Sequence, residues 1–349
     1  MRGQTIFYIK PLLLLLTAPL SMLMVDTAAA KYYRTDQAVP VVLVHADAAD
    51  ASEGDCQQVV LVDKSRQEVT LYRYDGRWQI SAQWPCSTGK VQGRKAIEGD
   101  QKTPEGVYFA IRDVGARYLT ETYGSRALPL DYPNLLDQQQ SRTGSAIWIH
   151  GTNKPLKPHD SNGCVVMGNA AINDLAARVK LQQTPVVIVD RLERTSIKAQ
   201  RAQSSAVLAA LEQWRHVLNH GSFAAFKKCY ERPAQPTMAW WRQWCRQRGS
   251  YSVGPEHQSI LSQRLVIRVG DTYVALFDHY LATRAHRVWA GRRKLYLKVG
   301  DDGVRILGDH FQSRTSSTRD PLFQAWKKLW RIDQRDPSIA AGKKHASDS

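Results

Sequence analysis

The sequence contains neither an internal repeat nor a low-complexity block, which excludes a repeat array as its architecture. Hydrophobic residues make up 43% of the 349 residues, a share that excludes a globally disordered chain. The length suffices for two domains of ordinary size. Acidic residues are scarce, since 32 Asp and Glu stand against 48 Lys and Arg, and the net charge is +16. This excess favours acidic partners, such as a nucleic acid, an anionic membrane face or an acidic polymer.

The positive charge is spread along the chain, and no nucleic-acid reader motif accompanies it. Its densest run, residues 284–298, alternates apolar and charged positions, as expected of a strand with one solvated face. The predicted export of the chain, described next, also argues against a nucleic-acid partner. We therefore expect no nucleic-acid partner.

The N-terminus has the pattern of a signal peptide over residues 1–30. A positive region with Arg2 and Lys10 precedes the apolar run PLLLLLTAPLSMLMV, and TAAA before Lys31 supplies a small-residue cleavage site. The apolar run contains two prolines and is too short for an ideal membrane-spanning helix, although an uncleaved anchor stays the alternative. Both interpretations predict an exported chain, which we place in the periplasm of a Gram-negative bacterium, with membrane contact only through this segment.

Cysteine is sparse, and its odd count of five in an exported chain leaves at least one thiol without an intramolecular partner. Cys229 and Cys245 lie on neighbouring helical stretches, where a disulfide is possible. Cys56 opens one predicted strand and Cys86 closes another, so these two are expected at opposite edges and unbridged. Cys164 is the cysteine that we expect to stay free.

Two patterns of hydrophobic spacing divide the chain. From Cys56 the pattern is that of strands, with a hairpin at Asp75-Gly76, a strand ending at His150 and one amphipathic helix over residues 169–180. After residue 205, helical spacing comes first and a period of two follows, which predicts helices packed on a curved antiparallel sheet. The predicted order is a signal peptide (1–30), a linker or loosely attached arm (31–55), a mainly β domain (56–190), a connecting helix (191–205), an α+β domain (206–315) and a basic tail (316–349).

Cys164 stands in the loop sequence SNGCVVM, fourteen residues after His150. A thiol attacks an acyl carbon only as the thiolate, so it needs a base within hydrogen-bond reach. A strand end and a returning loop can converge, and the backbone N–H groups of Gly163 and Cys164 are then placed to face an oxyanion. Spacing alone leaves open the alternative that Cys164 is a small buried hydrophobe beside Val165 and Val166.

Four motifs, STGK, GDQKTPEG, IHGT and SNGCVVM, together resemble the YkuD-type L,D-transpeptidases of bacterial cell walls over most of residues 56–190. The resemblance implies a β-sandwich with a short helix. It also implies that Cys164 is the nucleophile, that His150 is its base and that the backbone carbonyl of Gly151 orients the imidazole. The substrate-binding residues that it implies are Thr152, Ser161, Asn162 and Gly163.

The chain departs from this pattern at two positions. Many members carry His or Lys where this chain has Asn162, and Arg where it has Val166. The group that holds a substrate carboxylate is therefore open, and His159 or a basic residue elsewhere is a candidate. For GDQKTPEG itself we favour a structural role, because Asp100, Pro104 and Gly106 are turn-forming residues.

The second domain more loosely resembles the nuclear-transport-factor-two-like cone. Trp240, Trp241 and Trp244 either line its pocket or belong to its core, and helical spacing favours the core. A YkuD-type domain followed by such a cone resembles exported cell-shape enzymes that trim or rearrange murein peptides. Fold analogy gives the cone itself no activity.

The sequence therefore predicts acyl transfer on peptidoglycan stem peptides through a Cys164 thioester. An amine acceptor gives a cross-link or an attached lipoprotein. Water makes the enzyme an L,D-carboxypeptidase, or a peptidase that releases a murein-linked lipoprotein. A non-catalytic murein-binding scaffold is the lesser alternative. No metal or other cofactor is expected, because Cys164 has no metal-ligand spacing around it.

Overall fold

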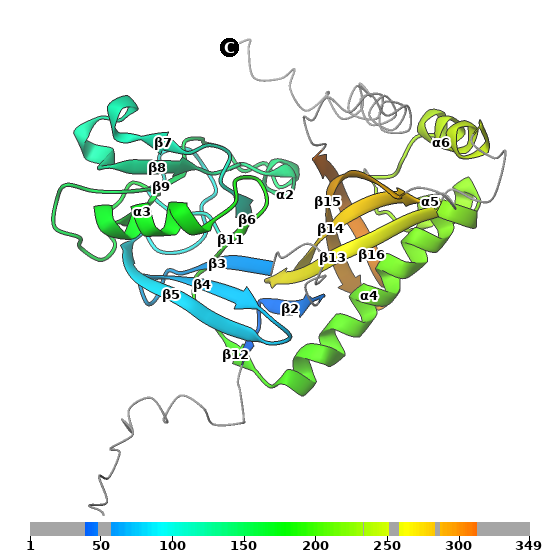
Figure 1. Cartoon of the computed structure of the whole chain (residues 1–349), viewed down its shortest axis with the longest axis horizontal. Coiled ribbons are helices and arrows are strands. Elements are labelled where there is room, and N and C mark those ends of the chain that lie inside the picture. Colours follow the sequence, from blue (N-terminus) through cyan, green and yellow to red (C-terminus); the bar gives the residue numbers. More distant parts are fainter. Residues whose placement is uncertain (1–38, 48–56, 233, 251–257, 283–286, 313–349) are drawn as a thin grey trace, which may run out of the picture. The chain divides into compact units, whose positions relative to one another are not determined.

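The computed structural model describes residues 39–47, 57–232, 234–250, 258–282 and 287–312 (Figure 1). The predicted signal peptide (1–30), Cys56 and the predicted basic tail (316–349) lie outside the described residues. No helix within the described ranges is long and apolar enough to cross a membrane.

The first domain begins with a meander of three antiparallel strands, β3 (Gln57–Asp63), β4 (Glu68–Tyr74) and β5 (Trp78–Ser87). The predicted hairpin at Asp75-Gly76 is confirmed, because it joins β4 to β5 and Gly76 takes a φ of +88° there. Glycine adopts this left-handed conformation without the penalty that a Cβ brings.

Nine strands form one continuous sheet in the order β6-β11-β3-β4-β5-β10-β9-β8-β7. The long strand β5 belongs to both halves, since one edge pairs with β4 and the other with β10. The remaining strands are β6 (Gly106–Phe109), β7 (Val114–Gly115), β8 (Arg126–Pro129), β9 (Trp148–His150), β10 (Val165–Met167) and β11 (Pro185–Val189).

The two halves of this sheet enclose a common core. On β3, Val60 and Val62 face that core, together with Leu128 of β8 and Ile149 of β9. Since successive strand residues point to opposite faces, Val59 and its alternate neighbours point the other way, into a second core. The predicted β-sandwich is confirmed.

Helices of the first domain are few and short. The predicted amphipathic helix is confirmed as α3 (Asn169–Arg178), and its Ile172 and Leu175 are buried in the core of the sandwich. The sequence patterns did not predict the other helices, which are η1 (Ala116–Tyr118), η2 (Glu121–Tyr123) and α2 (Leu135–Gln139). Elements of three to five residues carry too little periodicity to be seen in a sequence.

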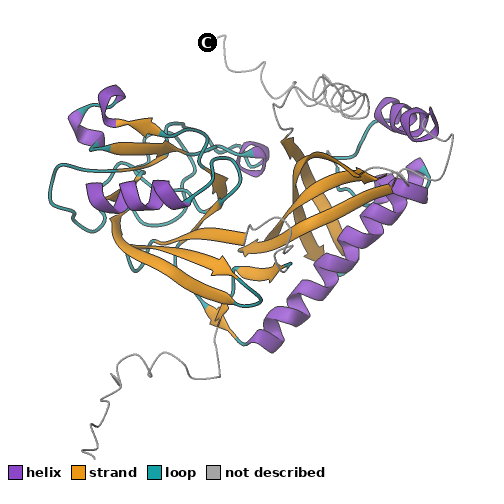
Figure 2. Ribbon diagram, viewed as in Figure 1, coloured by secondary structure: helices purple, strands orange, loops and turns teal. Residues whose placement is uncertain are grey.

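The second part of the chain is a five-stranded antiparallel sheet with helices, drawn in purple and orange in Figure 2. The long helix α4 (Ile197–His220) starts at the N-cap Ser196, whose hydroxyl accepts from the Ala199 N–H. The prediction of a separate connecting helix over 191–205 is wrong, because α4 runs without interruption past residue 205. The other elements are α5 (Phe223–Lys228), α6 (Met238–Ser250), β13 (Gln258–Val269), β14 (Thr272–Ala282), β15 (Arg287–Gly300) and β16 (Gly303–Gln312).

The prediction of a linker or loose arm over 31–55 is wrong for residues 39–47. The short strand β1 (Val39–Pro40) pairs with β12 (Arg194–Thr195), and β2 (Leu43–Ala46) is the edge strand of the five-stranded sheet beside β13. Leu43 and Val44 are buried on its two faces, one in each of two cores. A strand of four residues supplies too few positions to show a period, so only its partner strand fixes it.

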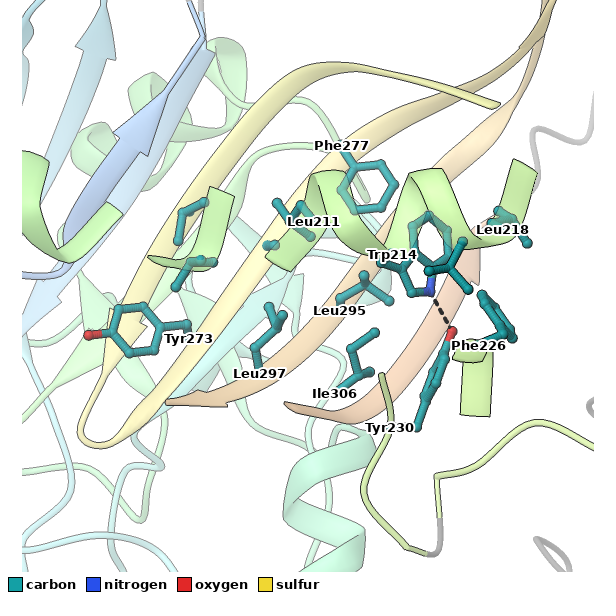
Figure 3. Close-up of a cluster of buried hydrophobic side chains, with 14 of the residues drawn as sticks. Leu211, Trp214, Leu218, Phe226, Tyr230, Tyr273, Phe277, Leu295, Leu297 and Ile306 are labelled. Atoms are coloured by element: carbon teal, nitrogen blue, oxygen red, sulfur yellow. Dashed lines mark hydrogen bonds between the residues drawn. The ribbon is translucent and has the colours of Figure 1, made fainter. Parts of the chain in front are cut away.

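Both faces of the five-stranded sheet are buried. One face, with Leu265 and Leu276, packs in the same core as Val59 of β3. The opposite face packs against α4, α5 and α6 around Trp214, whose indole N–H donates to the Tyr230 hydroxyl at 2.8 Å (Figure 3). The two alternatives for Trp240, Trp241 and Trp244 were a pocket lining and the core. All three are buried in this core. The likeness to the nuclear-transport-factor-two-like cone stays a prediction.

All four described cysteines are free thiols. The possible bridge between Cys229 and Cys245 is therefore not formed in this structure. Cys229 instead lies 3.8 Å from the Ala225 carbonyl oxygen, to which its thiol donates.

Candidate active site

Strand pairing places Cys164 and His150 on the same face of the sheet. Strands β9 and β10 are parallel, with Val165 opposite Ile149 and Val166 opposite His150. Val165 and Ile149 are fully buried and point into the core. Because side chains alternate along a strand, His150 points to the other face, and so does Cys164 just before β10. Cys164 and His150, fourteen residues apart in the sequence, thus lie on the same face of two adjacent strands.

A backbone carbonyl fixes the orientation and the tautomer of His150. The Nδ1 atom lies 2.7 Å from the carbonyl oxygen of Gly151. A carbonyl oxygen only accepts hydrogen bonds, so Nδ1 carries the proton and Nε2 keeps its lone pair. Burial lowers the pKa of His150 below its usual value of 6.5, although the Gly151 carbonyl partly opposes the shift. The imidazole is therefore neutral at pH 7, as a general base must be.

An aromatic ring that the motifs do not contain also contacts this imidazole. Tyr123, at the end of η2, meets the His150 ring edge-on with ring centroids 4.8 Å apart and an interplanar angle of 69°. The same ring lies 4.8 Å from the ring of Trp148. Tyr123 is twenty-seven positions from His150 in a segment without a periodic pattern, so sequence analysis had no signal for it.

The thiol of Cys164 is protonated at rest. Burial raises its pKa above the ordinary thiol value, and a backbone hydrogen bond from Trp148 and the nearby charge of Lys95 oppose this only in part. Its Sγ donates to the Ala146 carbonyl oxygen at 3.6 Å. Ala146 itself has a φ of +56°, a conformation that is unusual for a residue other than glycine and is enriched at functional sites.

Ser161 shapes the loop that carries the thiol. It is buried, and its hydroxyl donates to the Cys164 carbonyl oxygen at 2.7 Å while accepting from the Gly163 N–H at 3.1 Å. The expectation that the Gly163 N–H faces an oxyanion is therefore wrong for this arrangement, since Ser161 already takes that donor. Backbone bonds from Ser161 to Thr88 and Lys90 tie the loop to the segment after β5.

The segment GDQKTPEG supports the same loop from the other side. A Cβ on Gly163, which has a φ of +125°, would lie 2.9 Å from the Lys102 carbonyl oxygen, closer than side chains tolerate. Asp100 stiffens the segment by accepting from Lys95 at 2.8 Å and from several backbone N–H groups. Its partial burial would raise its pKa, but these donors prevail and lower the pKa to about 2. The segment thus has the structural role that the turn residues predict.

The remaining predicted binding residues lie around the loop. Asn162 is exposed, and its side-chain oxygen lies 3.5 Å from the ammonium group of Lys90, which is exposed too. Thr152 is half-buried and accepts from the Lys154 N–H at 3.0 Å, which closes a turn. His159 is half-buried, and its backbone N–H donates to the side chain of Gln67.

Two residues here had no role predicted from the sequence, Lys90, which ends the STGK motif, and Gln67. Gln67 is buried and binds both Thr88 and the backbone of His159, so it connects the two loops that flank the site. Within the described ranges, no group of three or more His, Cys, Asp or Glu side chains is placed to hold a metal ion.

Residues 57–188 match the family model of the L,D-transpeptidase catalytic domain, YkuD. No curated protein matches the chain at a significant level. Two solved structures resemble it over most of its length. Bd1075 of Bdellovibrio bacteriovorus is 23% identical with a TM-score of 0.66, over 80% of this chain and 100% of that one. The helical cell shape determining protein Pgp2 of Campylobacter jejuni is 22% identical with a TM-score of 0.57, over 82% and 98%. At this identity the likeness is one of fold.

Proposed function

We propose that the YkuD-type L,D-transpeptidase catalytic domain of residues 57–188 is an exported cysteine acyltransferase that acts on the stem peptides of peptidoglycan. The observation that carries the proposal is the 2.7 Å hydrogen bond from His150 Nδ1 to Gly151. It leaves Nε2 as the proton acceptor of a neutral imidazole on the same sheet face as Cys164. A cysteine nucleophile needs such a base, because its own pKa lies above neutral pH.

The first half of the reaction forms a thioester. His150 Nε2 takes the thiol proton while Cys164 Sγ attacks the carbonyl carbon of an L-centre joined to a terminal D-amino acid. The C–N bond then breaks, and His150 returns the proton to the leaving amine. The products are a stem peptide bound to Cys164 as a thioester and a free D-amino acid. Since Ser161 takes the Gly163 N–H, the Cys164 N–H is the remaining loop donor for the oxyanion.

The resting thiol must turn before it reacts. Its hydrogen bond to the Ala146 carbonyl directs the proton away from His150. When substrate binds, a rotation about the Cβ–Sγ bond of Cys164 redirects this proton toward Nε2. Hydrogen bonds between catalytic groups are often long in unliganded enzymes and shorten only when substrate is bound.

The second half of the reaction releases the acyl group to an amine or to water. An amine acceptor gives a cross-link or an attached lipoprotein, which is transpeptidation. Water gives L,D-carboxypeptidase activity, or release of a murein-linked lipoprotein when the bond is to such a protein. Both outcomes proceed through the same acyl-enzyme, and we assign transpeptidation as the primary activity because the matching family model is that of L,D-transpeptidases.

Lys90 is the proposed replacement for the basic residues that relatives carry at the positions of Asn162 and Val166. Its ammonium group donates to the side-chain oxygen of Asn162 at 3.5 Å, and Asn162 lies two residues before the nucleophile. An ammonium beside an amide donor is suited to a substrate carboxylate.

The export of the chain, its periplasmic location and its domain boundaries belong to the same proposal. Because the similar fold of Pgp2 belongs to a helical cell shape determining protein, we extend the proposal to cell-wall remodelling that affects cell shape.

Product analysis tests this function. Purified protein is incubated with tetrapeptide muropeptides, and the products are identified by mass spectrometry. New dimers or exchange of the terminal D-amino acid indicate transfer, tripeptides indicate hydrolysis, and a freed protein-linked species indicates lipoprotein release. The Cys164→Ala variant should give none of them. Conversion by this variant at the wild-type rate would refute the mechanism.

A further inference from the structure

Two glycines form a narrow slot that is filled by the side chain of Asn169. A Cβ on Gly124 would lie 2.2 Å from Asn169 Oδ1, and a Cβ on Gly151 would lie 2.3 Å from the same atom. Any larger residue at either position would therefore collide with the amide. The absence of both Cβ atoms lets the amide lie directly against two segments of backbone.

Polar bonds hold the amide in this slot at both ends. Asn169 Oδ1 accepts from the Ser125 N–H at 2.9 Å, and its Nδ2 donates to Asn153 Oδ1 at 2.8 Å. Asn153 in turn donates to the Glu121 carbonyl oxygen at 3.2 Å. The amide thus links the segment that contains η2 to the turn that follows His150.

The two segments that meet at Asn169 are the ones that touch the imidazole. The turn provides the Gly151 carbonyl oxygen on His150 Nδ1. The η2 segment provides the Tyr123 ring, which packs edge-on against the His150 ring. Gly124 follows Tyr123 directly, and a Cβ there would also come within 2.5 Å of the Gly151 carbonyl carbon. Both contacts of His150 therefore depend on how these two glycines are spaced.

The helix to which Asn169 belongs does not explain its side-chain bonds. Asn169 is the first residue of α3, and the N-cap of that helix is Gly168, which has no side chain for capping. The amide makes its bonds to Ser125 and Asn153, outside the helix. A residue that served only α3 would direct its oxygen to the free N–H groups of the first turn.

We propose that Asn169 is a positioning residue for His150, which sets the Gly151 carbonyl and the Tyr123 ring and thereby keeps the proton on Nδ1. This inference rests on the proposed function for its catalytic meaning, but its structural part holds without any substrate. Without the amide, the two glycine segments lose their common spacer and hydrogen-bond partner. The carbonyl then no longer selects one tautomer, and Nε2 is no longer held as the acceptor.

The test uses the full chain with ¹⁵N-labelled histidine and compares Asn169→Ala, Asn169→Asp and Asn173→Ala. Asp keeps an acceptor oxygen in the slot, whereas Asn173 is an exposed residue of the same helix and serves as the matched control. Nitrogen chemical shifts of His150 at pH 8 report which ring nitrogen carries the proton. We expect the Nδ1–H form alone in the wild type, in Asn173→Ala and in Asn169→Asp, and a mixture of both forms in Asn169→Ala.

Turnover of tetrapeptide muropeptides gives the second measurement. Asn169→Ala should lower kcat by up to about 100-fold, the cost of a misplaced catalytic group, while Asn169→Asp recovers most of it. The inference is overturned if Asn169→Ala keeps a single Nδ1–H form in a folded protein, or if its kcat equals that of Asn173→Ala. A wild type that is inactive on muropeptides but changes tautomer in Asn169→Ala would contradict the proposed function and leave the positioning role standing.

Discussion

Cys164 Sγ donates its hydrogen bond to the carbonyl oxygen of Ala146, at 3.6 Å, and not to His150. Burial raises the pKa of this thiol, which agrees with a proton that stays on sulfur. The resting site therefore holds a neutral thiol and a neutral imidazole on one sheet face, and not a preformed ion pair. Activation must coincide with substrate binding, and this has consequences that can be measured.

The resting thiol should react slowly with alkylating reagents at neutral pH. Because its pKa lies above 9.0, iodoacetamide labelling of Cys164 in the absence of substrate should rise with pH and have its midpoint above 9. Peptide mapping by mass spectrometry separates Cys164 from the other free thiols. Complete labelling at a rate independent of pH near 7 would indicate a preformed thiolate and contradict this resting state.

The pH dependence of turnover should report His150 on its acid side. The imidazole accepts a proton only when it is neutral, and burial lowers its pKa below 6.5. A base with a depressed pKa stays active to lower pH, so kcat/KM should be constant near pH 7 and fall only below about 6.5. The measurement is a pH profile of kcat/KM on tetrapeptide muropeptides. An acid-side midpoint above 6.5 would show that the imidazole gains net stabilisation of its charged form.

Replacing Gly124 should impair the site more than replacing a glycine at an open turn. Both Gly124 and Gly76 have positive φ, so Ala brings each of them a backbone penalty of about 1–2 kcal/mol. Only at Gly124 does the new Cβ collide with backbone, at 2.5 Å from Gly151, whereas nothing lies within 4 Å at Gly76. Overpacking should add about 1–3 kcal/mol to the loss of unfolding free energy.

Urea denaturation of Gly124→Ala and Gly76→Ala, together with kcat/KM, makes this comparison. Equal losses of stability in the two variants would show that backbone strain alone matters at Gly124. In that case the close contact between the two glycine segments would not constrain the site.

Removal of the Lys90 charge should weaken substrate binding. Lys90→Met keeps the length of the side chain but removes the ammonium group beside Asn162. We expect KM to rise by up to about 5-fold with little change in kcat, since an ion pair at an exposed site is worth at most about 1 kcal/mol. Lys198→Met, an exposed position on α4, is the matched control.

Substrates with one carboxylate amidated show which group Lys90 recognises. If it binds the terminal D-residue, amidation there should erase the difference between Lys90→Met and the wild type. If it binds the side-chain carboxylate of the preceding residue, amidation of that group should do so. An unchanged KM in Lys90→Met with the unmodified peptide would exclude Lys90 as a carboxylate ligand.

The sequence predicted the parts of the fold that are long and periodic. The meander from Gln57 to Ser87, the helix α3 and the strands after residue 258 each contain several repeats of their hydrophobic period. Strand β2 has four residues and is defined only by pairing with β13, more than two hundred positions away. The end predicted for the connecting helix fell inside α4, because a change in composition near residue 205 does not interrupt helical geometry.

The residues of the candidate site also fall into those that the sequence predicted and those that only the structure shows. Cys164, His150 and Gly151 stand in local motifs, so the residues themselves point to the chemistry. Tyr123 and Asn169 act through contacts between segments that only the folded sheet brings together. Lys90 ends the STGK motif, but its contact with Asn162 also depends on the fold. The Gly163 N–H shows the opposite case, since the motif predicted a free donor and the buried Ser161 hydroxyl takes it. Long-range contacts of this kind leave no periodic trace in one sequence.

The most direct test of the central claim is the intact mass of the protein after brief mixing with a tetrapeptide stem. We predict an adduct equal to the stem peptide without its terminal D-residue, located on Cys164 by peptide mapping and cleaved by hydroxylamine as a thioester is. The His150→Ala variant should accumulate the adduct far more slowly, and Cys164→Ala should not form it. Turnover without any covalent adduct, or an adduct on another residue, would contradict the account.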